Sequence, residues 1–119
     1  MPQTKTITVT VDAPNHAVRV DKMLESGTVL GETVFLWNLV PGGPGFKALL
    51  RVPGGAFKPE RAKAGVLEET VFGLVDNSGS PTPVRLQAAC KGDWPYDVIV
   101  IFEEGSNPPA LVPIVIIGD

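Results

Sequence analysis

The chain has 119 residues, of which 44% are hydrophobic and 19% are charged, and its formal net charge at pH 7 is −3. A chain of this length buries one core without help from metals or disulfide bonds, so we expect a single domain over residues 1–119. The acidic balance and the lack of a Lys/Arg cluster exclude the basic surface that nucleic-acid binding requires. Gly and Pro contribute 13 and 12 residues. Because helix interiors tolerate these two residues least, the composition indicates an all-β chain with short strands and frequent turns.

The start of the chain, MPQTKTITVTVD, has neither a charged region followed by an apolar run nor a small-residue cleavage site, so no secretory signal is expected. No apolar segment of 18 residues occurs, which predicts no membrane-spanning helix and no membrane partner. Cys90 is the single cysteine, so no intramolecular disulfide can form. We expect its thiol to pack as a small apolar group. Together these features predict a soluble, cytoplasmic protein.

Residues 4–11, TKTITVTV, place Thr on one side and Ile or Val on the other, which predicts a half-buried strand. The threonines are expected to face solvent because Thr has a high β-propensity. The sequence DAPNH over 12–16 predicts a turn, and AVRV over 17–20 predicts a second short strand. His16 is the lone histidine, and since a metal site needs partner ligands, we expect a solvated loop residue.

Residues 32–40, ETVFLWNLV, form the strongest predicted strand of the first half, and Trp37 is expected to anchor the core from it. The next stretch, PGGPGFK over 41–47, sets glycines beside a lysine as a phosphate-binding loop does. A phosphate loop opens a helix, however, and FKALLRV gives only seven residues before Pro53, without either glycine motif of nucleotide binding. We therefore predict consecutive tight turns followed by a short strand, KALLRV, over 47–52.

The segment AFKPERAKAG over 56–65 is the one with helical composition, because Pro59 suits a first helical position and Gly65 can end a turn. It predicts at most one short helical turn. The next segment, VLEETVFGLV over 66–75, contains an alternating strand, and DNSGSPTP over 76–83 predicts a loop.

The sequence VRLQAAC over 84–90 predicts a strand and KGDWP over 91–95 a turn. Both faces of YDVIVIF, 96–102, are apolar, which predicts a central strand. The last segment, ALVPIVIIGD over 110–119, is also apolar on both faces but is interrupted by Pro113. Since proline cannot donate to a ladder, this strand is expected at an edge or with a bulge.

About eight strands, turn signals every eight to twelve residues and no helix long enough for a parallel crossover predict an antiparallel Greek-key β-sandwich. The layout resembles immunoglobulin-like and cupredoxin-like sandwiches, and the closing PIVIIGD resembles the ending of small bacterial domains of the uncharacterised DP-EP type. The chain departs from cupredoxins because blue copper needs two imidazoles and a thiolate, and only one His is present. It departs from immunoglobulin domains because the paired cysteines are absent. We expect no metal and no cofactor.

Catalysis is not expected, because a catalytic constellation needs a nucleophile or acid with a base and an orienting group. His16 would have to be the base for any of the serines. The adjacent carboxylates Glu68–Glu69 and Glu103–Glu104 point to opposite faces of a strand and cannot share a substrate. The sequence therefore predicts a non-catalytic binding or assembly module, since sandwiches present loops and sheet edges to partners.

Two binding modes follow from this prediction. One is a small-molecule or carbohydrate site formed by loops 41–55 and 91–95. The other is a homodimer through the C-terminal strand and the sheet face beside it, in which Pro113 favours face-to-face packing over a continuous intermolecular sheet. The alternative to the dimer is a monomer whose loop 41–65 covers that face. The residues expected at the partner or ligand surface are Phe46, Trp94, Tyr96, Ile114 and Ile116.

Overall fold

The computed structural model describes residues 2–60, 62 and 67–119, and these residues form strands, turns and bends. The predicted all-β class is confirmed, with eleven strands among the described residues where about eight were expected. No helix that is long and apolar enough to span a membrane occurs in this part of the chain. The strands are β1 (Thr4–Asp12), β2 (Ala17–Val20), β3 (Leu24–Thr28), β4 (Val34–Gly42), β5 (Phe46–Val52), β6 (Phe57–Pro59), β7 (Thr70–Gly73), β8 (Val84–Ala88), β9 (Gly92–Pro95), β10 (Asp97–Phe102) and β11 (Ile114–Gly118).

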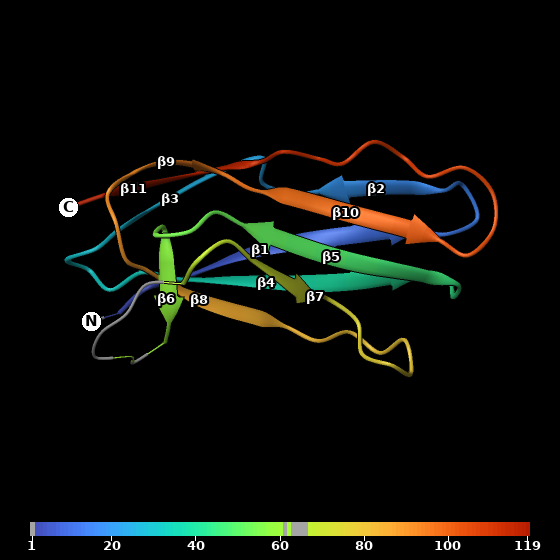
Figure 1. Ribbon diagram of the computed structural model, residues 1–119, viewed down its shortest axis with the longest axis horizontal. Helices are drawn as coiled ribbons and strands as arrows, with labels where there is room; N and C mark the ends of the chain where they lie inside the picture. The colour runs from blue at the N-terminus through green and yellow to red at the C-terminus, as the bar shows by residue number, and fades with distance from the viewer. Residues whose placement is uncertain (1, 61, 63–66) are drawn as a thin grey trace.

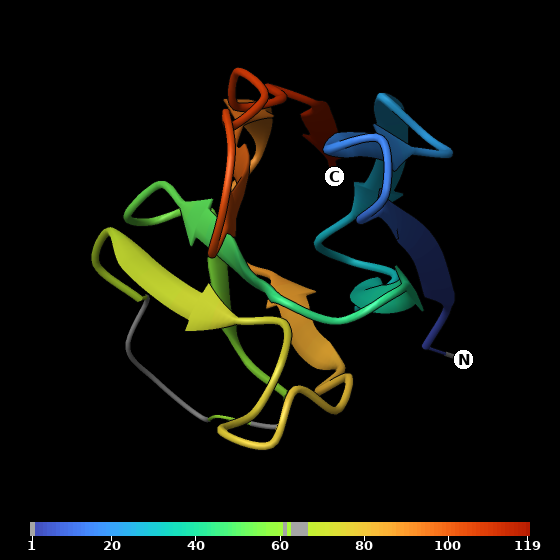
Figure 2. The ribbon, with the colours of Figure 1, turned by 90° about the vertical axis from the view of Figure 1, so that its right-hand side faces the viewer.

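The strands form two layers around one core, which agrees with the predicted sandwich. The first layer is a five-stranded sheet with the order β2-β1-β4-β8-β6. The second layer consists of two three-stranded sheets, β3-β11-β9 and β10-β5-β7, and β9 leads directly into β10 along the chain (Figure 1). Figure 2 shows from the end how the strands surround a common interior. Buried side chains from all three sheets belong to a single hydrophobic cluster that fills this interior.

One antiparallel register joins the two sheets of the second layer. Beyond the β9–β11 pairing, the Tyr96 N–H donates to the Pro113 carbonyl at 3.0 Å. Two residues further on, Val98 and Leu111 exchange backbone hydrogen bonds of 2.9 and 3.0 Å. Pro113 has no N–H to donate in return, so the ladder lacks one hydrogen bond at the point where β9 gives way to β10.

The positions of the last two predicted strands differ from the expectation. The C-terminal strand is not at an edge, because β11 lies between β3 and β9. The strand predicted over 96–102 as central ends the order of its own sheet as β10. Its outer side is covered by the bridge to Leu111 and by Asn107, whose side-chain oxygen accepts a 2.7 Å hydrogen bond from the Phe102 N–H.

Two strand pairs are parallel, which the sequence did not predict. Strand β1 pairs with β4 in parallel, and β3 pairs with β11 in parallel. Parallel neighbours need a long crossover, which was expected to require a helix. Between β1 and β4 the chain instead crosses through β2 and β3, and β3 belongs to the opposite layer. A strand in the facing layer therefore does the work of the crossover helix.

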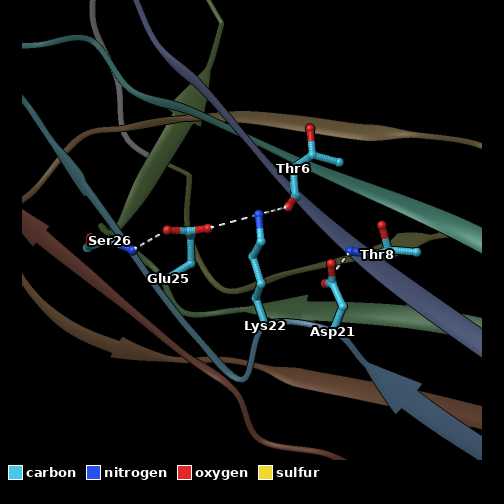
Figure 3. A network of polar contacts seen from close by, with 6 residues as sticks. All are labelled: Thr6, Thr8, Asp21, Lys22, Glu25 and Ser26. Atoms are coloured by element: carbon cyan, nitrogen blue, oxygen red, sulfur yellow. Dashed lines mark hydrogen bonds and ion pairs between the residues drawn. The ribbon is translucent and has the colours of Figure 1, made fainter.

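The edge of β1 that β2 leaves open is covered by the residues that follow β2 (Figure 3). The Asp21 carboxylate accepts a 2.7 Å hydrogen bond from the Thr8 N–H. The Asp21 backbone N–H donates one of 3.0 Å to the Thr8 carbonyl. The Lys22 ammonium donates to the Thr6 carbonyl at 3.0 Å and lies 3.4 Å from the Glu25 carboxylate. These contacts satisfy the Thr8 N–H and the carbonyls of Thr6 and Thr8, and the chain then continues into β3.

The alternating strands bury the faces that their patterns predicted. Ile7, Val9 and Val11 of β1 have no exposed surface, and their intervening threonines are half-buried on the other side. Trp37 of β4 is also fully buried, which confirms it as a core anchor. Its ring meets Tyr96 edge-on at a centroid distance of 5.4 Å and Phe57 at 5.7 Å. Such edge-to-face pairs fix ring orientation beyond the effect of area burial.

The glycines of 41–47 turn a corner, as the sequence predicted. Pro41 and Gly42 still belong to β4, and the chain then reaches β5 through Gly43 and Gly45, whose φ angles are 112° and 86°. Both angles lie in the left-handed region that favours glycine. The turn carries the chain from the first layer to the second.

Two short strands lie in segments for which the sequence predicted at most one short helical turn and a turn. Within 56–65, residues 57–59 pair with β8 as β6, so Pro59 ends a strand and does not open a helical turn, which stays within the predicted limit of at most one such turn. Arg61, Gly65 and the rest of 63–66 lie outside the described residues. The predicted turn 91–95 is strand β9, paired with β11. Its turn residue Gly92 has a φ of 149° and begins the strand beside the Trp94 ring. Pairing with a distant strand overrides local turn chemistry in both places.

Replacing Trp37 by Ala should lower the free energy of unfolding by about 3–5 kcal/mol, because it empties a large, fully buried site. Urea denaturation followed by circular dichroism measures this. The matched control is Trp94→Ala, which removes the same ring from a partly buried position and should cost less. An equal or reversed order of the two variants would show that Trp37 is not the main anchor.

Candidate functional site

The outer side of the second layer carries most of the large apolar side chains that are exposed. On β11, Ile114 is 40% and Ile116 is 38% exposed. Ile114 lies between Leu24 on β3 and Pro95 on β9, so three apolar residues form one row across three strands. Ile116 lies between Ser26 and Asp93 in the next row.

The same surface continues over β10, β5 and β7. Alternate residues of β5 point outward: Lys47 lies opposite Ile101 on β10, and Leu49 lies opposite Ile99. Arg51 lies between Asp97 on one side and Val71 on the other. We call this outer surface of the second layer the apolar face. Its exposed apolar side chains are Leu24, Val71, Ile101, Val112, Ile114 and Ile116.

Strands β10 and β11, which are apolar on both sides, place one side in the core and the other at the surface. Val115 and Ile117 of β11 and Val98 and Val100 of β10 point inward and are buried. Their neighbours in sequence supply the apolar face. In the described part of segment 41–65, the strands are built into the two layers, and Ile114 stays exposed. The alternative in which this segment covers the face is therefore not observed.

The outer side of the first layer has a different chemistry. It carries the threonines of β1, with Thr10 between Arg19 on β2 and Val40 on β4. Further along, Leu36 is half-buried beside Arg85. Val40 is the one large aliphatic residue of this side among the exposed residues in the described part of the chain, at 48%. The sandwich is therefore polar outside one layer and apolar outside the other.

A hollow of about 350 Å³ opens on the apolar face between the two predicted binding loops. It is lined by Arg51, Val52, Pro53, Glu69, Pro95 and Asp97. The Arg51 guanidinium crosses it to the Asp97 carboxylate at 2.6 Å. None of these lining residues is aromatic, so the hollow offers no platform for stacking a sugar ring.

A larger groove, of about 540 Å³, runs beside the first residues of β5 and the loop after β7. Its loop is held by Asp76, whose carboxylate accepts hydrogen bonds from the Ser78 N–H and hydroxyl and from the Ser80 N–H. The Ser78 hydroxyl, followed by the two N–H groups, holds the pKa of Asp76 below its usual value. The carboxylate therefore stabilises the turn through one oxygen, Oδ1, which accepts all three hydrogen bonds.

The five predicted surface residues separate into three groups. Ile114 and Ile116 lie on the apolar face, as expected. Tyr96 is only 2% exposed and lies in the core, so its expected surface position is wrong. Phe46 and Trp94 are partly buried and pack against the core. No local sequence pattern marks Leu24 and Val71 as surface residues, because their place on the face depends on pairing with distant strands.

Trp94 points inward at the end of β9. Its indole N–H donates a 2.8 Å hydrogen bond to the carbonyl of Cys90. The Cys90 thiol itself is exposed, contrary to the expectation that it packs as an apolar group. With Trp94 turned inward, loop 91–95 does not present an aromatic ring to a ligand.

His16 is not the solvated loop residue that its turn predicted. Its ring stacks on Phe102 at a centroid distance of 4.6 Å and an interplanar angle of 12°. The ring Nδ1 donates to the Ser106 carbonyl at 3.0 Å. Gly105, with a φ of 87°, leaves the space that this ring occupies, since a Cβ there would overlap it. His16 thus fastens the loop after β10 to the turn after β1.

The described residues contain no group of three or more His, Cys, Asp or Glu side chains that could hold a metal ion. No protein-family model matches the chain, and no curated protein matches its sequence. Among solved structures, the fold is similar to a chain described as the N-terminal domain of phage TP901-1 ORF48. The two share 12% sequence identity over 100% of each chain, with a TM-score of 0.43. A likeness of this size carries no functional argument.

Burial raises the pKa of Tyr96 to about 12; the nearby Trp37 indole N–H opposes this shift, and the Asp21 and Glu25 carboxylates add to it. The Trp37 nitrogen and the Tyr96 hydroxyl make no hydrogen bond of acceptable geometry with each other or with other described residues. The indole therefore acts on the hydroxyl only as a nearby dipole. The phenol is neutral and sealed in the core, which is a structural role.

Stability should fall as the pH rises from about 10 to about 12, by about 2–3 kcal/mol. The reason is that the unfolded chain loses the Tyr96 proton near its ordinary pKa of about 10, whereas the folded chain keeps it until about 12. Tyr96 is the single tyrosine, so phenolate absorbance reports this group alone. Denaturation at several pH values, with Tyr96→Phe as the control that lacks this contribution, measures the effect. A folded protein that titrates near pH 10 would contradict the burial of Tyr96.

Proposed function

We propose that the chain is a non-catalytic binding or assembly module that contacts another protein through the apolar face, and that a second copy of the chain is its first partner. The observation that carries this proposal is the contrast between the two outer sides of the sandwich. Strands of the first layer place threonine and charged residues outward, whereas β11 places Ile114 and Ile116 there. Monomeric proteins rarely expose large contiguous apolar patches, and those that occur mark interaction sites.

The edges of the second layer argue for contact through a face. The C-terminal strand has β3 on one side and β9 on the other, so it has no open edge for another strand. The outer side of β10 is occupied by Leu111 and Asn107. A partner therefore gains more by covering the apolar face than by adding a strand beside β10 or β11.

The other functions are less well supported. The hollow between loops 41–55 and 91–95 lacks an aromatic ring, and its Arg51 is already paired with Asp97, which disfavours a carbohydrate site. The lone His16 is stacked on Phe102 and bonded to a backbone carbonyl. This placement supports a packing role for the imidazole instead of a role as a general base.

Substituting Ile114→Lys or Ile116→Lys should convert the self-associated protein to a folded monomer, because a charge in the apolar face is costly to bury. Size-exclusion chromatography with light scattering measures the mass, and circular dichroism checks the fold. The control is Val40→Lys, which places the same charge at a residue of similar exposure, 48%, on the first layer. It should leave the mass unchanged.

Two results would contradict the proposal. One is a parent protein that stays monomeric at every concentration tested. The other is a parent assembly that Val40→Lys disrupts as strongly as the two β11 variants, because the apolar face would then have no special role. A variant that unfolds is replaced by Ile114→Ser, which removes the apolar side chain without adding a charge.

A further inference from the structure

Residues 103–111, which we call the strap, return from the end of β10 along the outer edge of that strand without forming a regular strand (Figure 1). At one end of the strap, Leu111 exchanges two backbone hydrogen bonds with Val98, in the antiparallel register that continues from β9 and β11. At the other end, the Asn107 side-chain oxygen accepts a 2.7 Å hydrogen bond from the Phe102 N–H. The strap therefore occupies the place of an antiparallel neighbour of β10.

Between these two contacts, the pairing fails at Val100. Residues two apart in a strand direct their backbone groups to the same side, so the N–H and C=O of Val100 point toward the strap as those of Val98 do. The register places Pro109 opposite Val100, and proline has no N–H to donate. Neither backbone group of Val100 makes a hydrogen bond with a described residue, although Val100 is only 2% exposed. Buried backbone groups without partners are rare and unfavourable, so the strap covers Val100 without satisfying it.

His16 holds the strap near its start. The His16 ring stacks on Phe102 at a centroid distance of 4.6 Å, and its Nδ1 donates to the Ser106 carbonyl at 3.0 Å. Gly105 leaves the space for this ring, because a Cβ there would overlap the imidazole. Most residues of the strap itself are exposed. A segment with so few buried contacts of its own is of the kind that opens locally, and the contacts from the turn after β1 oppose that opening.

We propose that the strap is a displaceable cover, and that an extended, proline-free segment of a partner protein takes its place beside β10. The strap itself shows what this edge accepts, because residues 107–111 lie antiparallel along residues 98–102 in equal number. With the strap closed, the apolar face is the surface offered to a partner. With the strap open, the edge of β10 becomes a second surface, so this inference goes beyond the proposed function and does not depend on the apolar face.

Two opposing effects set the affinity of such a segment. A proline-free strand pairs with both backbone groups of Val100, which the strap leaves unbonded, and each added hydrogen bond strengthens binding by about two- to tenfold. Strand addition of this kind takes its affinity from backbone hydrogen bonds. Against this, only molecules with an open strap can bind, so the apparent affinity falls in proportion to the open fraction. A looser strap should therefore raise the affinity, and a tighter strap should lower it.

The probe is the peptide acetyl-SNTVALV-amide, which is the sequence of residues 106–112 with Thr and Val in place of Pro108 and Pro109. The control peptide, acetyl-SNPPALV-amide, keeps both prolines. The proline-free peptide should bind about tenfold more tightly than the control, because it adds hydrogen bonds at Val100. Titration of the full chain followed by the amide NMR signals of residues 98–102 measures and locates the binding. The Val100 N–H should become protected from hydrogen exchange when the peptide binds.

Two variants of the chain shift the strap in opposite directions. His16→Ala removes the ring stack and the bond to Ser106, so it should raise the affinity for the proline-free peptide about tenfold. Pro108→Thr/Pro109→Val allows the strap to pair with Val100 as a regular strand, so it should protect the Val100 N–H and block the peptide. The matched control is Ile114→Lys, which alters the apolar face and should leave peptide binding unchanged.

The outcomes separate the two proposals. If the proline-free peptide binds His16→Ala no better than the control peptide does, or if its signals change on the apolar face instead of at residues 98–102, the displaceable cover is overturned and the proposed function stands. Asn107→Ala, which removes the bond to Phe102, replaces His16→Ala if that variant unfolds. Affinity that falls in the order His16→Ala, parent, Pro108→Thr/Pro109→Val supports the cover.

Discussion

The antiparallel register between residues 92–98 and 111–117 is the constraint on which the second layer depends. It pairs β9 with β11 and continues to the Val98–Leu111 bridge, so two three-stranded sheets act as one layer. The same register decides which residues face the core. With Val115 pointing inward beside Trp94, Ile114 and Ile116 have to point outward. A shift of the register by one residue would bury Ile114 and Ile116 and expose Val115. The apolar face is therefore a direct consequence of the pairing.

Pro113 has two effects on this ladder. It removes one N–H where the chain passes from the Leu111 bridge to β11, and it keeps the carbonyl that accepts from Tyr96. The missing bond separates the two sheets without breaking their alignment. The segment 107–113 forms no regular strand along β10, yet Asn107 and Leu111 still occupy that edge. In the second layer, the outer edge of β10 is covered and the apolar face is exposed. A sheet that grows by adding strands has the opposite arrangement, an open edge.

The sequence predicted the elements whose signal is local and missed those that depend on distant partners. Alternation over 4–11 and 32–40 was sufficient to place two strands and their buried faces, including Trp37. The strand of residues 92–95 and that of residues 57–59 carry turn-forming residues, and only pairing with β11 and β8 makes them strands. The same reason explains the candidate site. A strand that is apolar on both sides does not reveal which side is inward, so Tyr96 was expected at the surface and lies in the core.

The polar outer side of the first layer limits what the apolar face can build. Threonine suits an exposed strand position as well as isoleucine does by β-propensity, but its hydroxyl keeps the surface hydrated. Between Arg19 and Val40, Thr10 lies in a row that offers little apolar area to a partner. A molecule with two apolar sides can stack without end. In a molecule with one apolar side, the first isologous contact buries that side on both copies and leaves no apolar side for a third. If the chain associates through Ile114 and Ile116 as proposed, Thr10 and its neighbours on the far side would close the assembly at two copies and prevent open-ended stacking.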